Sequence, residues 1–375
     1  MSFKKGFAYL VATVALMAPN VLFAEKIVDI VGREVEVPKK VERILLGEGR
    51  YFHALALLEG DEPFKRIVGW QGDFKKLDPQ NYNEYKKKFP QIDDIPLIGG
   101  STTDTVSNEK VLMLNPDIAI FGISGHGPMQ EGSLVGLLER MGVPVVFVDF
   151  RSYPLKNTIP SMKILGKMLG REDEANEYIE FYTAKLDEIK KRVATIPEDK
   201  KVKAFIELRA GSSDDCCLTA GNGSMGEFIE VAGGKNIATG LLPGVFGNVN
   251  LEKLLMENPD VYIITGTQTK DSTANGAKLG AEVDYESALG SANTLLKRKI
   301  IEHLGAVKNH RTSAIWHGYY NIPQNIIAIE AFAKWLYPEL FSDVDLESTR
   351  AYIHKNFLAI EPTGTFWVDD YNIAK

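Results

Sequence analysis

The residues of this chain best suited to chemistry are arginines and aromatic side chains that follow predicted strands. Arginine pairs with anions through a planar set of donors, and aromatic faces stack on planar or cationic groups. Because loops at the carboxyl ends of parallel strands meet at one edge of a sheet, these side chains are expected to converge on one ligand. The candidate ligand-binding residues are Arg50, Tyr51, Trp70, Arg151, Arg209, Phe246, Trp316, His317, Tyr319 and Tyr320.

Two of these aromatic residues have a competing structural interpretation. Trp70 and Phe246, taken singly, are more typical of core packing than of ligand contact, because aromatic side chains dominate protein cores. Arg50, Arg209 and the cluster at 316–320 are stronger candidates, since arginine is rarely buried without a partner.

Neither a direct metal site nor a catalytic centre is predicted. The six histidines show no ligand-like spacing, and the two cysteines are adjacent. Gly221, Gly223 and Gly226 match a dinucleotide-binding pattern, but a Gly-rich turn follows where that pattern needs a second strand ending in an acidic residue. Because no triad can be assembled from the motifs present, no catalytic residue and no covalent cofactor is assigned.

The strongest organising signal is a ten-residue segment that occurs twice. Residues 109–118 return as 252–261, with a constant offset of 143 residues and seven identical positions. In each copy, apolar residues at helical spacing precede Asn-Pro, which ends a helix, and an apolar run typical of a buried strand follows. Two similar α/β lobes are the natural interpretation, and chance recurrence of a common connector is the alternative.

The remaining pattern of strands alternating with helices predicts a parallel sheet covered on both faces in each lobe. For the first lobe we expect a hairpin at 27–37, a helix at 51–59 and strands at 41–46, 67–70, 117–121 and 145–148. A charged helix at 172–193, about 33 Å long at ~1.5 Å per residue, can reach from one lobe to the other. For the second lobe we expect strands at 203–208, 261–265 and 312–316, and helices at 224–232, 251–257 and 323–335.

Three segments stand apart from this pattern. Residues 270–293 carry little hydrophobic periodicity and are expected to form an exposed insertion, and a tail extends beyond Trp335. Either segment could reshape one edge of the ligand site.

The neighbours Cys216 and Cys217 would need a distorted backbone to form a disulfide, so a vicinal disulfide and a pair of free thiols both stay open.

Length, charge and the first residues limit the class of protein. A chain of 375 residues is expected to contain two domains. The net charge of −7 argues against a nucleic acid or an anionic membrane as partner, because both need a basic footprint. Lys4 and Lys5 precede an apolar stretch too short to span a bilayer, which is typical of an export signal cleaved near Ala24. The mature protein is therefore expected in the periplasm, without a membrane span.

Several motifs in this order resemble those of one known family. The chain resembles the periplasmic binding proteins for siderophores, haem and cobalamin. The features that it shares with them are an export signal, a hairpin, a strand followed by a Gly turn, the repeated unit, a long helix and the Gly-Gly-Lys-Asn-Ile-Ala segment at 233–238. The resemblance covers 28–335. It implies an α/β fold with two Rossmann-like lobes and central parallel sheets, a single long rigid helix joining them, and a ligand cleft between them.

The same resemblance implies partners and a docking role. The family delivers its ligand to the permease and ATPase of an ABC importer in the inner membrane, and Glu109 and Glu252 match its permease-docking positions. Carboxylates on a rigid frame favour orientation and fast association. The alternative is that each glutamate merely complements the N-terminus of its helix.

These observations predict a periplasmic solute-binding protein that captures a ferric siderophore and performs no catalysis. Haem and cobalamin are alternatives, since Tyr51, His317, Tyr319 or Tyr320 could ligate haem iron. An exported hydrolase that uses the cleft as an active site is a distant alternative. We expect a monomer with a signal peptide at 1–24, an N-terminal lobe at 25–157, a linking helix region at 158–197 and a C-terminal lobe at 198–375.

Overall fold

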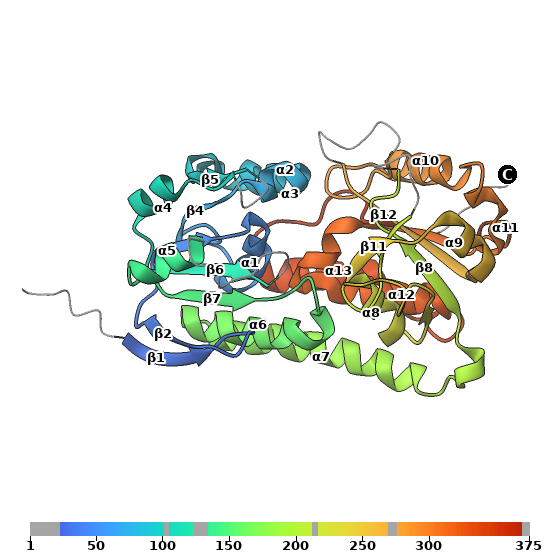
Figure 1. Ribbon diagram of the computed structural model, residues 1–375, viewed down its shortest axis with the longest axis horizontal. Helices are drawn as coiled ribbons and strands as arrows, with labels where there is room; N and C mark the ends of the chain where they lie inside the picture. Colours follow the sequence, from blue (N-terminus) through green and yellow to red (C-terminus); the bar gives the residue numbers. More distant parts are fainter. Residues whose placement is uncertain (1–22, 101–104, 124–133, 212–216, 269–275, 370–375) are drawn as a thin grey trace, which may run out of the picture.

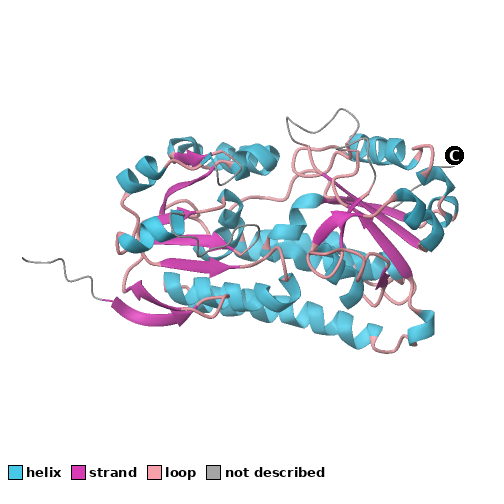
Figure 2. Cartoon of the chain, in the orientation of Figure 1, coloured by secondary structure: helices cyan, strands magenta, loops and turns pink. Residues whose placement is uncertain are grey.

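The computed structural model describes residues 23–100, 105–123, 134–211, 217–268 and 276–369. Two α/β lobes lie next to each other along the long axis of the molecule, each with a central sheet and surrounding helices (Figures 1 and 2). A pair of helices runs beneath both lobes in these views. The predicted fold class, two Rossmann-like lobes with parallel sheets, is therefore confirmed.

The first lobe is built on a fully parallel sheet with the strand order β5-β4-β3-β6-β7. Its central strands are apolar and buried on both faces, as expected when helices cover both sides of a sheet. The strands are β3 (Ile44–Leu46), β4 (Ile67–Gln71), β5 (Leu97–Gly99), β6 (Ile118–Gly122) and β7 (Val145–Val148). The helices are α1 (Phe52–Glu59), α2 (Asp73–Leu77), α3 (Pro79–Lys88), α4 (Asn108–Leu114) and α5 (Leu134–Arg140).

A hairpin precedes this sheet, as the alternation around Gly32 predicts. Strands β1 (Phe23–Val28) and β2 (Glu34–Pro38) pair antiparallel. Gly32 has a φ of 85°, a backbone conformation that glycine adopts without a steric penalty.

The second lobe has the strand order β10-β8-β12-β13-β14, in which only the edge strand β14 is antiparallel. The strands are β8 (Lys203–Glu207), β10 (Lys235–Asn236), β12 (Val261–Gly266), β13 (Thr312–Trp316) and β14 (Trp367–Val368), and β9 (Leu218–Ala220) pairs with β11 (Phe246–Asn248) apart from this sheet. The helices are α8 (Met225–Val231), α9 (Leu251–Glu257), α10 (Tyr285–Leu296), α11 (Gly305–Lys308), α12 (Ile326–Leu336) and α13 (Leu346–Phe357).

Two helices, rather than one, connect β7 of the first lobe to β8 of the second along the chain. Helix α6 (Pro154–Leu169) packs along α7 (Glu172–Val193), and α7 has the bounds predicted for the long helix. Just before α7, Arg171 lies 3.5 Å from Glu59 of the first lobe. Further along, the Tyr178 hydroxyl donates to the carbonyl of Pro323 in the second lobe. Helix α7 is thus tied to both lobes, as Figure 1 shows along the lower edge of the molecule.

The two copies of the repeated segment lie in different lobes and have the same local structure. The side chain of Ser107 caps α4 by accepting a hydrogen bond from the backbone N–H of Lys110. Asn250, 143 residues later, caps α9 in the same way through the N–H of Lys253. Each helix ends at a left-handed asparagine, Asn115 or Asn258, both with a φ of 43°. Asparagine tolerates this conformation better than most residues, which explains why Asn precedes Pro in both copies.

The aspartate of each copy ties its helix to the neighbouring strand. Asp117 accepts hydrogen bonds from the backbone N–H groups of Glu42 and Arg43, just before β3. Asp260 accepts one from the N–H of Lys203, at the start of β8. The repeated sequence therefore encodes a repeated helix, turn and strand unit, one in each lobe.

The prediction of an exposed insertion at 270–293 is wrong for its described part, 276–293. Ala277, Leu279 and Val283 are buried, and α10 begins at Tyr285. Buried apolar residues recur at every second position from Ala277 to Val283, through a segment with a turn at 281–282, and helical periodicity does not reveal this pattern. In the described part of the tail, residues 336–369, α13 and β14 complete the second lobe.

Cys217 is fully buried and disulfide-bonded. Cys216, the only other cysteine in the sequence, lies outside the described residues.

Candidate ligand-binding cleft

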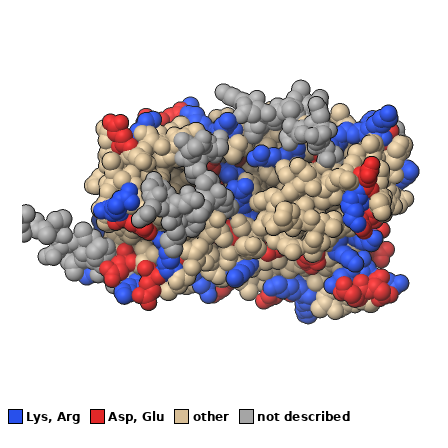
Figure 3. All heavy atoms as spheres, viewed as in Figure 1, with Lys and Arg blue, Asp and Glu red and all other residues tan. Residues whose placement is uncertain are grey.

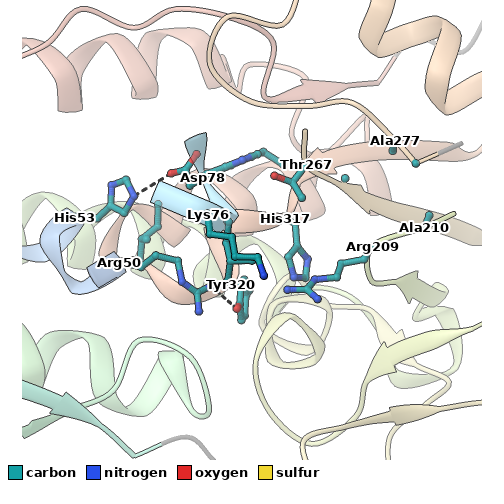
Figure 4. Close-up of a pocket in the computed structure, with 16 residues that line it drawn as sticks. Arg50, His53, Lys76, Asp78, Arg209, Ala210, Thr267, Ala277, His317 and Tyr320 are labelled. Carbon is teal, nitrogen blue, oxygen red and sulfur yellow. Dashed lines mark hydrogen bonds and ion pairs between the residues drawn. The ribbon is translucent and has the colours of Figure 1, made fainter. Parts of the chain in front are cut away.

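A pocket of about 200 Å³ lies between the lobes and receives residues from both (Figure 4). The first lobe contributes Arg50, His53, Lys76, Leu77 and Asp78. The second contributes Arg209, Ala210, Gly266, Thr267, Gly276, Ala277, Trp316, His317, Gly318, Tyr320 and Ile322. Most of these residues follow the carboxyl end of a strand, where the topology of an open parallel sheet leaves a crevice.

Arg50 reaches into this pocket from the turn after β3, and a buried carboxylate fixes its direction. Asp73, two residues beyond β4, accepts hydrogen bonds from the backbone N–H of Gly49 and from Arg50 Nε, at 2.5 and 2.8 Å. The guanidinium then donates through Nη1 to the hydroxyl of Tyr320 in the second lobe, at 2.6 Å. Arg50 therefore contributes to the site as a positioned donor rather than as a mobile surface charge.

Arg151 is held in a similar way at the end of β7. The carboxylate of Asp149 accepts from the backbone N–H groups of Arg151 and the two residues after it. The Arg151 guanidinium carbon lies 5.4 Å from the ring centre of Tyr320 and 5.3 Å from that of Phe246, within the range of cation–π contact. Arg151 and Phe246 thus adjoin the pocket through Tyr320, although neither lines it directly.

One buried hydroxyl organises the second lobe's side of the pocket. Thr265, near the end of β12, accepts from the backbone N–H of Arg209 at 2.8 Å, and its Oγ1 lies 2.9 Å from Nδ1 of His317. Arg209 has a φ of 50°, which is uncommon and costly for a residue with a side chain. The hydrogen bond that Arg209 N–H donates to Thr265 Oγ1 supports this conformation, which brings Arg209 beside His317 (Figure 4).

The three arginines shift the pKa values of both aromatic groups that they surround. Burial lowers the pKa of His317 well below its ordinary value, and the nearby charges of Arg209, Arg50 and Arg151 lower it further. For Tyr320, burial acts to raise the pKa, but the positive charges of Arg50 and Arg151 and the hydrogen bond from Arg50 outweigh it, so the pKa is lowered. The shift of the Tyr320 pKa therefore reflects the positive charges of the arginines, which also favour anions in the pocket, whereas burial is the main cause for His317.

The first lobe also contributes a residue that the sequence did not single out for the site. His53, on α1, is buried against Phe74 and also lines the pocket, with Nε2 3.2 Å from Asp78 Oδ2. Lys76 and Asp78 were missed as well, although α2 and the start of α3 follow β4 directly. Their position after the carboxyl end of a strand is a signal in the sequence, and the same signal indicates Arg50.

Five predicted ligand-binding residues line the pocket: Arg50, Arg209, Trp316, His317 and Tyr320. Three others do not face it. Trp70 packs among Phe52, Phe64 and Phe74 in the core of the first lobe. The buried Tyr51 bonds to Glu48, and the buried Tyr319 packs against Trp316 and Phe366. A residue after a strand can turn toward the core or toward the crevice, and only packing decides which.

Glu109 and Glu252 are exposed in the first turns of α4 and α9. These helices lie in opposite lobes, toward the two ends of the molecule (Figure 1). Figure 3 shows basic side chains in the hollow between the lobes and many acidic ones toward the ends of this face.

No helix in the described ranges has the length and apolar character needed to cross a bilayer. Over the same ranges, His, Cys, Asp and Glu do not gather in threes as a metal site would require.

The chain matches known proteins in sequence and in fold. A family model described as periplasmic binding protein matches residues 68–314. The molybdate-binding protein MolA of Haemophilus influenzae is 21% identical over 341 residues, which cover 86% of this chain and 87% of that protein.

Solved structures resemble the whole two-lobe arrangement. The TroA-like periplasmic binding protein FepB from Veillonella parvula has a TM-score of 0.81 at 24% identity, covering 92% of this chain and 99% of that one. An ABC-type Fe3+-hydroxamate transport protein from Saccharomonospora viridis has a TM-score of 0.57 at 18% identity, covering 84% and 99%. At these identities the likeness establishes the fold.

Proposed function

The chain belongs to the periplasmic binding protein family, and from that premise we propose that it binds an oxygen-rich anion in the pocket between its lobes. The observation that carries the proposal is the convergence of Arg50, Arg151 and Arg209 around Tyr320 and His317, where the arginine charges lower the pKa of Tyr320 against the effect of burial. Guanidinium groups bind carboxylate, phenolate and oxyanion oxygens through several hydrogen bonds at once. Binding involves no covalent step.

A ferric siderophore is the first candidate for this anion. Its chelating oxygens and negative charge suit the arginines, and its planar groups suit Trp316 and Tyr320. The similar protein from Saccharomonospora viridis is described as part of Fe3+-hydroxamate transport, which supports this choice.

A compact oxyanion is the second candidate, and the size of the pocket favours it. Pockets for drug-sized ligands measure roughly 300–1,000 Å³, whereas this one measures about 200 Å³. The sequence relative from Haemophilus influenzae is described as binding molybdate. A siderophore would need the lobes to move apart, and a tetrahedral oxyanion would not.

Haem is supported less well than either anion. Of the four candidate iron ligands, Tyr51 and Tyr319 do not line the pocket. His317 and Tyr320 remain available, and the lowered pKa of His317 keeps its imidazole neutral, as ligation requires. Cobalamin has no specific support among these contacts.

The proposal can be tested by titrating the purified protein with candidate ligands. These are sodium molybdate, ferric catecholate siderophores, ferric hydroxamate siderophores and haem. We expect one anionic ligand to quench tryptophan fluorescence saturably, because Trp316 lines the pocket, and haem to give no sharp Soret band. Salt should weaken binding. Tight binding of a neutral or cationic ligand, with no anion bound, would overturn the proposal.

Periplasmic binding proteins serve the permease and ATPase of ABC importers, and we propose that Glu109 and Glu252 dock this one. Both are exposed, and both occupy the same position of the repeated unit, one in each lobe. Such a pair can engage two basic sites on a partner at once. If so, Glu109→Gln with Glu252→Gln should abolish uptake in cells and leave ligand affinity in solution unchanged, and normal uptake would refute the role.

We also propose that residues 1–24 are an export leader. A register shift separates Phe23 from Glu25 in the hairpin, and regular pairing continues from Glu25 to Val28. Cleavage after Ala24 would thus preserve the regular part of β1. N-terminal sequencing of protein from a periplasmic extract should begin at Glu25, and a chain that retains Met1 would contradict the leader.

A further inference from the structure

Helices α4 and α9 expose the same apolar residues in both lobes. Met113 has 79% of its surface exposed, and Met256, at the equivalent position of the repeat, has 80%. The preceding leucines, Leu112 and Leu255, are 41% and 39% exposed. Large apolar side chains are seldom left this accessible in two matching places, and a recurring exposed patch marks a contact surface.

Folding of each helix does not require these side chains. Val111 and Leu254, one position earlier than the leucines, are fully buried and anchor the two helices to their lobes. The side chain of Ser107 or Asn250 and the left-handed asparagine already determine where each helix begins and ends. The exposed leucine and methionine are therefore available for a partner.

Each apolar pair adjoins a proposed docking glutamate. Leu112 and Met113 lie three and four residues after Glu109, and residues at these spacings share one face of a helix. Leu255 and Met256 have the same relation to Glu252. Each lobe thus presents one carboxylate next to one flexible, polarisable thioether, a side chain that adapts to irregular apolar surfaces.

We propose that Leu112 with Met113, and Leu255 with Met256, are two equivalent apolar contacts by which this protein docks on the permease of its importer. The inference rests on the proposed function and deepens it. Two matching patches, each beside a carboxylate, would suit a partner with two matching sites that each combine apolar and basic groups. Two matching patches in separate lobes fit such a partner.

Other occupants fit these patches less well. A second copy of the chain in a symmetric dimer would use one self-complementary patch rather than two patches toward opposite ends of the molecule. An anionic lipid surface would repel the adjoining glutamates and the net charge of −7. The duplicated combination of carboxylate and methionine is the chemistry of a protein partner with basic and apolar groups.

The test uses proteoliposomes that contain the permease and ATPase supporting ligand uptake in the source cells. Full-length mature protein loaded with ligand is titrated against the ATPase rate. We expect Met113→Gln with Met256→Gln to raise the half-saturating concentration at least tenfold. The control Met141→Gln, an exposed methionine outside the repeats, should leave it unchanged. Ligand affinity and melting temperature should stay at wild-type values in both proteins.

The outcomes separate this inference from the function on which it rests. If Glu109→Gln with Glu252→Gln weakens coupling but the methionine variant couples like wild type, docking stands and the apolar contacts are overturned. If the loaded wild-type protein never stimulates the ATPase, both proposals fail. Flotation with protein-free anionic vesicles that depends on Met113 and Met256 would assign the patches to lipid and overturn the inference.

Discussion

The guanidinium of Arg50 donates a 2.6 Å hydrogen bond to the hydroxyl of Tyr320, a residue 270 positions away and in the other lobe. Asp73 fixes the far side of the same guanidinium, and His317 stacks on the Tyr320 ring with centroids 4.5 Å apart. This contact closes the floor of the pocket across the interface. If the proposed anion binds here, it would compete with the phenol for Arg50, and ligand binding would then be coupled to the contact between the lobes.

The first prediction concerns the ionisation of Tyr320. Although burial acts to raise its pKa, Arg50 and Arg151 lower the pKa below the ordinary value, so Tyr320 should release its proton before the buried tyrosines whose pKa values are raised. Phenolate absorbance during a pH titration should lose its earliest step in Tyr320→Phe and keep it in Tyr153→Phe.

A bound anion should move this step to higher pH, because it offsets the charges that favour the phenolate. By linkage, anion affinity should fall as pH rises through the same step. If the ligand does not change the pH of this step, Tyr320 does not belong to the binding site.

The second prediction concerns Arg209, whose exposed side chain lines the pocket. Arg209→Ala should weaken anion binding about ten- to hundredfold, because hydrogen bonds to charged groups contribute roughly 1.5–3 kcal/mol. Tryptophan quenching measures the loss. Arg140→Ala, which removes an exposed arginine from α5, serves as the matched control. Equal affinities for both variants would remove Arg209 from the site.

The third prediction concerns Thr265, which bonds to both Arg209 and His317. Thr265→Val keeps the shape of the side chain but removes the hydroxyl, so ligand affinity should fall several-fold and the melting temperature should drop. Thr312→Val is the control on the neighbouring strand, because its buried Oγ1 has no hydrogen-bond partner among the described residues. That control should be neutral or stabilising. A matching loss in both variants would indicate a general packing defect.

The fourth prediction concerns stability at acidic pH. Burial lowers the pKa of His354 to about 4, even though its Nδ1 donates to the carbonyl of Ile360. Below a pH of about 6.5 the unfolded chain binds a proton at this residue and the folded chain does not, until the pH reaches about 4. As the pH falls through this window, the free energy of unfolding should therefore decrease, and His354 should account for up to roughly 3 kcal/mol of that loss.

Chemical unfolding at several pH values measures that slope. His354→Gln should flatten it, because glutamine retains a donor for Ile360 and cannot ionise. The exposed His303→Gln should leave the slope as in the wild type. A slope that persists in His354→Gln would assign the acid sensitivity elsewhere, with the buried His317 as the next residue to change.

Local signals in the sequence were sufficient for most of the scaffold. The repeat predicted two helix, turn and strand units, and both copies have the same caps and the same left-handed asparagine. The helix predicted at 172–193 has those bounds, because its charge pattern and flanking breakers are local. Alternating apolar residues from Ala277 to Val283 carried an equally local signal that helical periodicity did not reveal.

The sequence by itself determined the two-lobe α/β framework and the arginines that follow its strands, because periodicity, capping and turn chemistry depend on near neighbours in the chain. Only the tertiary structure decided which aromatic residues reach the pocket. Trp70 and Trp316 both lie at the carboxyl end of a strand, yet one packs in a lobe core and the other lines the cleft. That choice depends on which surfaces meet when distant segments pack, as Arg50 and Tyr320 do.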